Sequence, residues 1–536
     1  MSRGDKRVNK LTIYLIKEGM TDLSSVLKTA SNPLSIDGVG DFYYSESRPN
    51  RPSWLTHFFG GRLNEDLPLI SSSAQGLLIV PMKFKGKERW FALAFGHGRH
   101  LLVQDAVEDR FGLKVVLNSA DPESLRSIDK TSLGSVPKHS REQMSRAVNA
   151  SEFGIDIEQD LVSSVTAKSQ DTIMGTMPTG RDALSVSVPV DLDNLKEFLE
   201  HCYERYTSLD YKKNFGWIDQ ICEVRDRTRL VELDNAIAEK IANGELDKIW
   251  MAVPSLVNWV DVEGFTYSRP KSPELYSDIG LESFLESLGD KPVTAATLHD
   301  EPVFMIHEST GASERWPAFL CIYGEIVDGK STYLLTGGKW YEIARDFVEE
   351  VNRHYASFEP SSISFPTYAH DNEAKYNIDA AMQLGAASLD KKNIWHGGGQ
   401  SQIEFCDILT TSNQLVYVKK YSASSVLSHL FAQGVTGGEL FVADPVFREK
   451  LNEILPDANK LTDPSDAIDA SKYEIVYAII SYSSKPLDIP FFSKVSLKNA
   501  RRRLAGFGYK VRLQKIVSGV PTKIARKGKA EVALAA

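Results

Sequence analysis

Cysteine is scarce in this sequence, which has four cysteines among 536 residues. They stand at positions 202, 222, 321 and 406, and no two of them form a CxxC pair. This spacing argues against a structural zinc site built on cysteines and against a disulfide scaffold. Scattered thiols in a long chain are typical of a reducing compartment, so we expect a cytoplasmic protein.

Long apolar runs are also missing from the sequence. No stretch approaches the roughly 18 consecutive apolar residues of a membrane span, so we expect no membrane contact. The first apolar run, Leu11 to Ile16, is too short for the core of a signal peptide. Hydrophobic residues still make up 42% of the chain and charged residues 25%, which excludes a disordered or fibrous protein.

The chain has no overall excess of positive charge, because its formal net charge is −9. This excludes a protein that binds nucleic acid through bulk charge alone. Ten basic residues and no acidic one nevertheless lie between Arg501 and Lys529. That stretch is either a solubilising tail or a binding patch for phosphates. The residues of the stretch that we assign to nucleic-acid binding are Arg501, Arg502, Arg503, Lys510 and Arg512.

Composition and patterning predict an α/β and α+β protein of several domains. An N-terminal α/β domain is expected over 1–130, with a helix at 101–111 and a strand at 114–117. The polar residues 119–150 indicate a loop or linker. A middle α+β region for recognition or assembly follows over 131–366, and its hairpin is marked by Asp328-Gly329. The Ser/Pro-rich residues 357–366 mark the next boundary, and 521–536 form a basic, flexible tail.

The third predicted domain, 367–520, has the clearest pattern. A helix is expected over 373–384, with Ile378, Ala381 and Met382 on its apolar face. Strands follow at 403–409 and 414–421, and Ser422 is placed to cap a helix that reaches Gln433. A fully apolar strand at 474–481, a helix around Leu497 and a strand at 509–517 complete the order helix, strand, strand, helix, strand, helix, strand.

Charged residues interrupt the apolar strands of this domain. Asp407 ends the segment Glu404-Phe405-Cys406-Asp407, and Lys419 shares one face of the next strand with Tyr417. Glu373 opens the preceding helix. Hydrolysis of a phosphodiester requires carboxylates that hold Mg²⁺ or Mn²⁺, and a lysine beside the metal can orient the attacking water. Asp407, Lys419 and one of Glu373 or Glu404 are residue types that suit this chemistry.

This order of elements and charges resembles the αββαβαβ core of the restriction-endonuclease-like, or PD-(D/E)xK, nucleases, which is built on a mixed sheet. The resemblance implies that Asp407 holds the metal, that Glu404 or Glu373 is the second metal-binding carboxylate, and that Lys419 positions the water. It also implies that Gln433 belongs to the catalytic set and that His429 supports the substrate phosphate. The sequence departs from the pattern at Tyr417, where that fold usually carries an acid.

A second resemblance spans most of the chain and links it to a bacterial family known as "sporadically distributed protein". The segments that carry it are Lys10 to Ile16, Phe95-Gly96-His97-Gly98-Arg99, Phe111 to Asn118, Gly338-Lys339-Trp340-Tyr341, Tyr376-Asn377, Glu404 to Asp407, Val418-Lys419 and Ser428 to Gly434. A patchy distribution is typical of genes in mobile and defence islands. The resemblance therefore implies an anti-phage or restriction role, together with partner proteins of a defence system.

These features lead to one main hypothesis and two alternatives. The main hypothesis is a metal-dependent endonuclease that cleaves foreign nucleic acid, most simply DNA, and acts as a homodimer. The first alternative is a module of the same fold that binds nucleic acid or a partner protein without cutting. The second alternative is a nucleotide- or small-molecule-sensing protein that uses the turn Gly96-His97-Gly98-Arg99.

Overall fold

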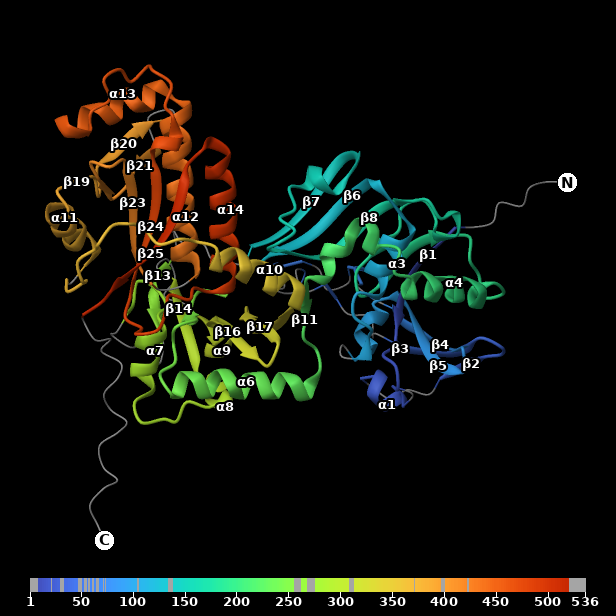
Figure 1. Ribbon diagram of the computed structural model, residues 1–536. Helices are drawn as coiled ribbons and strands as arrows, with labels where there is room; N and C mark the ends of the chain where they lie inside the picture. Colours follow the sequence, from blue (N-terminus) through green and yellow to red (C-terminus); the bar gives the residue numbers. More distant parts are fainter. Residues whose placement is uncertain are drawn as a thin grey trace, which may run out of the picture. The chain divides into compact units, whose positions relative to one another are not determined.

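The computed structural model describes residues 8–519 apart from 21, 29–32, 47–50, 53–54, 56–57, 60–61, 64–66, 71, 73, 104–105, 134–137, 255–261, 268–274, 308–312, 371, 397–400 and 422–423. The chain forms two compact units (Figure 1). One comprises Met1–Ser132 and Lys138–Ile218, and the other comprises Leu133–Pro137 and Asp219–Ala536. The tail 521–536 and the expected helix cap Ser422 lie outside the described residues.

The first unit is built on a ten-stranded sheet with the order β2-β3-β4-β5-β1-β10-β9-β8-β6-β7. Helices α3 and α4 bury Val115, Phe198 and Leu199 in one core with Leu11 and Ile13 of β1. Its elements are β1 (Asn9–Leu15), α1 (Leu23–Val26), β2 (Leu34–Ile36), β3 (Gly40–Glu46), β4 (Ala74–Phe84), β5 (Lys87–Gly96), α3 (Phe111–Ser119), β6 (Ala120–Ser132), β7 (Lys138–Val148), β8 (Asp160–Ser169), β9 (Thr179–Gly180), β10 (Leu184–Val188), α4 (Leu195–Thr207) and α5 (Lys212–Phe215).

Three expectations for this unit are wrong. The helix predicted at 101–111 begins only at Phe111, and the strand predicted at 114–117 lies inside α3. A short apolar run does not distinguish a buried helix from a strand, and here the whole run is buried against the sheet. The loop predicted at 119–150 is the strand pair β6 and β7. These strands lie at one edge of the sheet, where charged side chains are common.

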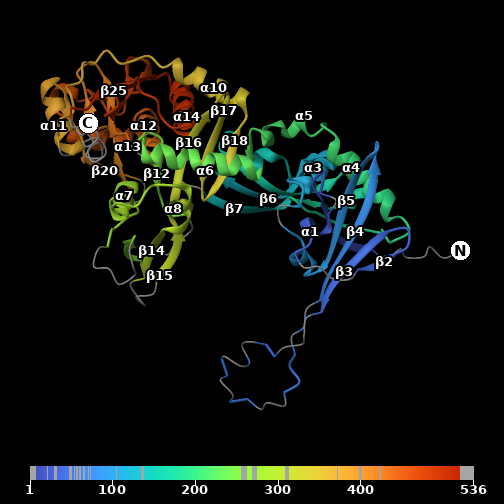
Figure 2. The same ribbon diagram turned by 90° about the horizontal axis from the view of Figure 1, so that it is seen from below.

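The second unit begins with β11 and a five-stranded sheet of order β11-β18-β17-β16-β12, beside a three-stranded sheet β13-β14-β15. Helix α6 packs Leu233 and Ile237 against the five-stranded sheet (Figure 2). The predicted hairpin is confirmed, since Asp328 pairs with Ser331 across a turn in which Gly329 has a φ of 59°. The elements are β11 (Ile221–Glu223), α6 (Arg227–Ala242), β12 (Ile249–Met251), β13 (Val262–Thr266), α7 (Leu281–Leu288), α8 (Ala295–Asp300), β14 (Pro302–His307), β15 (Ser313–Pro317), α9 (Ala318–Cys321), β16 (Ile322–Asp328), β17 (Ser331–Thr336), β18 (Lys339–Ile343) and α10 (Arg345–Ala356).

The C-terminal part of this unit holds a second five-stranded sheet, of order β19-β22-β23-β24-β25, and the small hairpin sheet β20-β21. Strands β22 and β23 are antiparallel, whereas β23, β24 and β25 are parallel. The elements are α11 (Glu373–Gln383), β19 (Ala387–Ser388), β20 (Asn393–His396), β21 (Ser401–Glu404), β22 (Ile408–Leu409), β23 (Gln414–Lys420), α12 (Ser424–Ala443), α13 (Pro445–Ile454), β24 (Glu474–Ser481), α14 (Phe491–Phe507) and β25 (Lys510–Val517).

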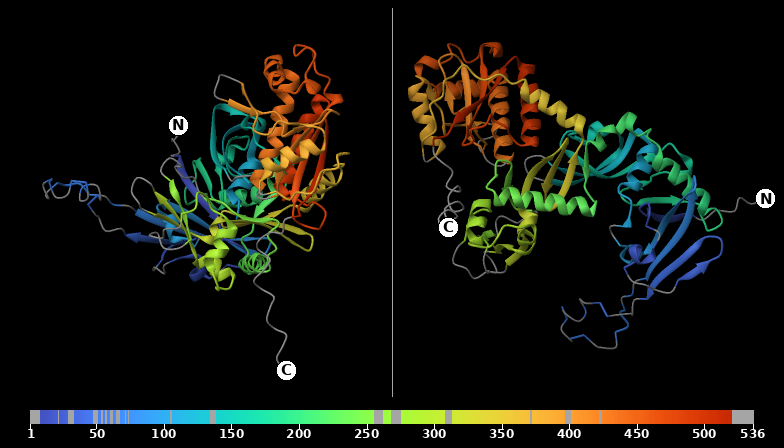
Figure 3. Two further views of the ribbon diagram at one scale, coloured as in Figure 1. Left: turned by 90° about the vertical axis from the view of Figure 1, so that its left-hand side faces the viewer. Right: turned by 60° about the horizontal axis from the view of Figure 1, so that its bottom comes forward.

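Helices cover both faces of this sheet (Figures 1 and 3). On one face α11 packs Tyr376 and Ala380 against Val418 of β23. On the other face α12 and α14 pack Phe431 and Leu497 against the alternate residues of the same strands. Because successive side chains of a strand point to opposite faces, each strand contributes to both cores. A parallel strand that is buried in this way is expected to be mostly apolar, as β24 is between Glu474 and Ser481.

The broad architecture follows the expectation of a mixed α/β protein with several sheets, but two details differ. The strand predicted at 403–409 is interrupted, because Phe405, Cys406 and Asp407 separate β21 from β22. The apolar face predicted for α11 is correct at Ala381 but wrong at its other two residues. Ile378 and Met382 are 57% and 74% exposed, and the helix instead buries Tyr376, Asn377, Ala380 and Ala381.

Candidate metal and phosphodiester site

The candidate site lies where β22 stops pairing with β23. The two strands pair only at Ile408 with Val416 and at Leu409 with Leu415, whereas β23 continues to Lys420. Beyond this pairing, side-chain carboxylates bond the backbone of β23. Asp407 Oδ2 accepts the N–H of Val418 at 2.6 Å, and Glu373 Oε1 accepts the N–H of Lys420 at 3.0 Å. Two acidic side chains are thereby held at the carboxyl end of β23.

Three carboxylates converge beside this strand end. Asp390 follows β19, Glu404 ends β21 and Asp407 precedes β22, and their carboxylate oxygens lie within 4.8 Å of one another. The turn that presents Asp390 is held by the N–H of Lys391, which donates to Glu404 Oε1 at 2.7 Å. Lys391 adopts a left-handed φ of 61°, which is uncommon for a residue with a side chain. The backbone is therefore shaped to bring Asp390 and Glu404 together.

The cluster holds three carboxyl groups close together. Burial raises the pKa of Asp407 to about 8, and the charges of Glu404 and Asp390 act in the same direction. The hydrogen bond from Val418 opposes this rise. Carboxylates this close repel one another, and a divalent cation with oxygen ligands would remove that repulsion. The residues present fit Mg²⁺ or Mn²⁺, because all of the converging ligand atoms are carboxylate oxygens.

Lys419 stands beside the cluster and contacts a fourth carboxylate. Its Nζ donates to Glu373 Oε2 at 2.9 Å. Burial lowers the pKa of Lys419, but Glu373, Asp407 and Glu404 outweigh that effect and the pKa is raised overall. The ammonium group therefore stays protonated at neutral pH. Glu373 is held at the start of α11 because Asn372 caps this helix, accepting the N–H of Lys375 at 3.0 Å.

Tyr417 takes no part in the carboxylate cluster. Its side chain is buried on the α12 face, and its hydroxyl donates to the carbonyl of Phe405 at 2.5 Å. Gly437 of α12 lies directly over this bond, since a Cβ atom there would stand 2.7 Å from both oxygens. The tyrosine therefore secures the break between β21 and β22. The acid that the PD-(D/E)xK pattern places at this position has no counterpart on β23, and Asp390 supplies the additional carboxylate from a different element.

The structure brings together four of the five predicted catalytic residues, in two adjoining groups. Asp407 and Glu404 lie in the carboxylate cluster, while Glu373 is bonded to Lys419. The fifth, Gln433, is partly buried on α12, and His429 is exposed one turn earlier. Within the described residues no hydrogen bond or ion pair connects either side chain to the carboxylates.

Asp390 is a residue of the candidate site that the sequence pattern did not indicate. It belongs to the polar segment Asp390-Lys391-Lys392, which has no strand or helix periodicity. The only signal was an acidic residue in a turn between two elements of the predicted core.

Some of the basic residues assigned to nucleic-acid binding contact other side chains, and others are exposed. Arg501 donates to Ser357 Oγ at 2.8 Å and lies over the ring of Phe358, and Arg503 pairs with Glu439 at 2.7 Å. Arg512 pairs with Glu474 and Glu359. Arg502 and Lys510 are exposed. Lys510 starts β25, at the end of the sheet where the parallel strands begin, whereas the carboxylates lie where β23 ends.

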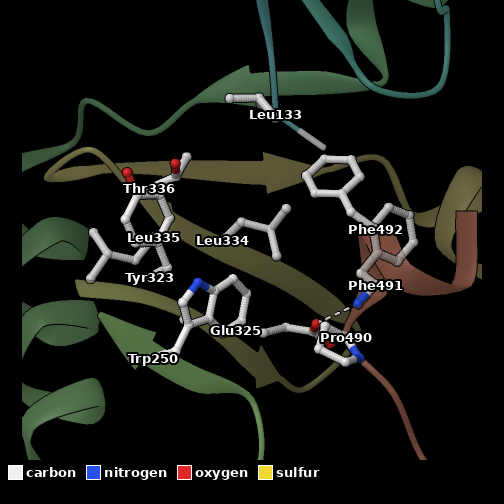
Figure 4. A pocket seen from close by; sticks show the side chains of 11 residues that line it. Leu133, Trp250, Tyr323, Glu325, Leu334, Leu335, Thr336, Pro490, Phe491 and Phe492 are labelled. Atoms are coloured by element: carbon white, nitrogen blue, oxygen red, sulfur yellow. Dashed lines mark hydrogen bonds between the residues drawn. The ribbon is translucent and has the colours of Figure 1, made fainter. Parts of the chain in front are cut away.

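A separate pocket of the second unit is lined mainly by apolar side chains (Figure 4). Trp250, Tyr323, Leu334, Phe491 and Phe492 are among the residues that line it. Glu325 is the sole carboxylate in its lining, and it accepts the N–H of Phe491 at 2.8 Å and pairs with Lys248 at 3.1 Å. This pocket therefore offers apolar surface and no cluster of free metal ligands.

The family model that matches this chain covers residues 11–517 and is described as a family of unknown function, DUF6119. The chain belongs to this family. The match includes every carboxylate of the candidate site as well as Lys419, so the site lies within the DUF6119 region. No curated protein and no solved structure matches the chain. Within the described part of this DUF6119 protein, every helix is too short or too polar to span a membrane.

Proposed function

We propose that this protein is a metal-dependent nuclease that hydrolyses phosphodiester bonds of foreign nucleic acid. The observation that carries the proposal is the convergence of Asp390, Glu404 and Asp407 beside the Lys419–Glu373 pair. In such a site, Mg²⁺ or Mn²⁺ on the carboxylates polarises the phosphoryl oxygen and lowers the pKa of the attacking water. Lys419 orients that water and offsets charge in the transition state, while Glu373 holds the lysine in place.

The order of elements supports the comparison with the restriction-endonuclease-like core. Helix α11 precedes the antiparallel strands β19, β22 and β23, helix α12 follows, and β24 returns parallel to β23. In the resemblance to the PD-(D/E)xK nucleases, the acid comes from the first strand of a hairpin and the lysine from the second. Asp407, directly before β22, and Lys419, on β23, correspond to these two residues. The further strand β25 extends the sheet on its parallel side.

The substrate and setting are parts of the same proposal. Arg502, Lys510 and His429 are exposed and can donate to phosphates, whereas Arg501, Arg503 and Arg512 would need to exchange their present partners. The resemblance to a patchily distributed bacterial family supports an anti-phage or restriction role in the cytoplasm. We take DNA as the principal substrate, a homodimer as the acting form, and defence-system proteins as partners.

A second candidate function is a module of the same fold that binds nucleic acid or a partner protein without cutting. The observation that favours it is Tyr417, which fills the place of the usual acid with a buried aromatic ring. The presence of Asp390 favours the enzyme, because it restores a third carboxylate to the cluster. Catalysis therefore decides between the two candidates.

The test is a cleavage assay on plasmid DNA, phage DNA and RNA with Mg²⁺ or Mn²⁺, beside EDTA controls. Asp407→Asn and Lys419→Ala are compared with Asp457→Asn, which removes an exposed carboxylate at a 3-10 helix outside the cluster. The proposal expects metal-dependent cutting that is lost in the first two variants and kept in the third. If the protein cuts none of these substrates but still binds DNA, the non-catalytic module is established instead.

A further inference from the structure

Lys420 ends β23 and lies between two tyrosine rings. Its Nζ is 5.4 Å from the ring centre of Tyr368 and 5.7 Å from that of Tyr482. Tyr482 directly follows β24, and Tyr368 pairs with Ser518, directly after β25. The ends of three neighbouring parallel strands thus meet around this ammonium group. In sheets of this kind, the carboxyl ends of the strands are the usual place for a ligand.

The charge of Lys420 is not matched by an acid. Lys419 is paired with Glu373, but no ion pair joins the Lys420 side chain to a carboxylate within the described residues. Glu373 accepts only the backbone N–H of Lys420. A hydrogen bond with Tyr482 raises the pKa of Lys420, so the group stays charged. Aromatic faces hold an ammonium group without using all of its N–H donors, which leaves donors for an anion.

Glu373 connects this ammonium group to the candidate site. One of its oxygens bonds the side chain of Lys419 and the other bonds the backbone of Lys420. The two lysines therefore flank one carboxylate at the same strand end. We propose that Lys420, with Tyr368 and Tyr482, forms a binding subsite for a backbone phosphate of nucleic acid, next to the phosphodiester bound at the carboxylates. This inference rests on the proposed nuclease function and names a contact for its substrate.

The experiment measures binding of a fluorescently labelled DNA duplex by anisotropy, with Ca²⁺ present, between about 50 and about 200 mM salt. Lys420→Gln removes one phosphate contact, so the slope of log K against log salt concentration should fall in magnitude by about 0.9. Affinity should fall about tenfold at the low-salt end. Lys420→Arg should keep the slope, because it keeps the charge. The Mg²⁺-induced thermal shift, which reports the carboxylate cluster, should be the same in all three proteins.

The matched control is Lys472→Gln, which removes the same charge just before the start of β24, at the other end of that strand. Its slope should equal that of the wild type. If the wild type binds the duplex and Lys420→Gln behaves like Lys472→Gln, the subsite is overturned while the nuclease proposal stands. If the wild type binds neither a DNA duplex nor an RNA, the nuclease proposal fails and the subsite fails with it. Circular dichroism of each variant confirms that it is folded.

Discussion

Asp407 accepts the backbone N–H of Val418 at 2.6 Å, at the point where β22 no longer pairs with β23. The same carboxylate stands within 4.8 Å of Asp390 and Glu404. One side chain therefore accepts a hydrogen bond from the sheet and also contributes an ionisable carboxyl group to the cluster. The first role needs an oxygen acceptor, and metal binding needs a group that can ionise, so the two roles can be separated by substitution.

Asp407→Asn keeps an oxygen for Val418 and removes the ionisable carboxyl group. We expect the metal-free variant to be at least as stable as the wild type, because burial and the charges of Glu404 and Asp390 both disfavour an ionised group at this position. We also expect it to lose the stabilisation that Mg²⁺ gives the wild type, which reaches about 2.7 kcal/mol at a hundredfold excess over Kd. Thermal unfolding with and without Mg²⁺ measures both effects.

Asp407→Ala serves as the control for this substitution. It removes the acceptor as well, so an additional loss of about 1–3 kcal/mol in unfolding free energy is expected from the unpaired N–H of Val418. A full Mg²⁺-dependent shift in either variant would show that the metal is bound elsewhere.

Asp390→Asn tests the carboxylate that the sequence pattern did not reveal. This residue lies in a turn and accepts none of the backbone bonds that define β23, so the fold should tolerate the change. We expect Mg²⁺ affinity to fall about tenfold or more, which is about 1.4 kcal/mol of binding free energy. Isothermal titration with Mg²⁺ or Mn²⁺ measures the loss. Equal affinity in Asp390→Asn and in the control Asp457→Asn would remove Asp390 from the site.

Lys419→Met tests the role of the lysine in chemistry rather than in metal binding. The substitution keeps most of the side-chain length and removes the donor to Glu373. We expect the cleavage rate to fall about 10²- to 10³-fold, while the Mg²⁺-induced thermal shift is retained. Single-turnover cleavage of a plasmid measures the rate. A variant that cuts at the wild-type rate would exclude Lys419 as the group that orients the water.

The predicted elements that proved correct are those with a complete and unambiguous periodicity. Strand β24 is buried on both faces and apolar between Glu474 and Ser481, and helix α14 ends at Gly508, whose φ is 103°. A short apolar segment of this kind predicts a strand that is buried on both faces. The helix start at Glu373 and the end of the strand that carries Lys419 were likewise located within a residue or two, although the sequence assigned Glu373 to the metal and did not predict its pairing with Lys419.

The remainder of the site depends on backbone features that leave no pattern in the sequence. Asp390 lies near Glu404 because Lys391 adopts a left-handed backbone conformation. Glycine is the residue type that usually indicates this conformation in a sequence, whereas lysine does not. The strand predicted at 403–409 is broken at Phe405 because the carbonyl of that residue bonds Tyr417 and packs under Gly437. Both features come from tertiary contacts between distant segments, which local propensity does not encode.

In the first unit, an ion-pair network predicts a pH dependence of stability. A hydrogen bond from Arg141 and the charge of Arg181 lower the pKa of Asp129, against the opposing effect of burial. A carboxyl whose pKa is lower in the folded state stabilises the fold above its unfolded pKa of about 3.9, and this contribution is lost as the pH falls through the folded pKa. The wild type should therefore have a higher thermal unfolding temperature than Asp129→Asn. This difference should be constant from about pH 7 to about pH 5 and should disappear as the pH falls further.

Asp193→Asn, at an exposed position of the same unit, is the control for this experiment. Its thermal unfolding temperature should equal that of the wild type at every pH. If the difference in unfolding temperature between the wild type and Asp129→Asn increased on acidification, the stabilising role of the Asp129 ion pairs would be contradicted.

Tyr417→Glu places an acid where the PD-(D/E)xK pattern expects one. Because Tyr417 is 2% exposed and packs against Tyr477 and Phe405, the new carboxylate would be buried among apolar groups rather than added to the metal site. We expect a loss of about 3 kcal/mol or more in unfolding free energy and no gain in Mg²⁺ affinity. Tyr417→Phe loses only the bond to Phe405 and should cost about 1–3 kcal/mol. Urea unfolding of both variants separates these effects, and tighter Mg²⁺ binding by Tyr417→Glu would mean that residue 417 can reach the cluster after all.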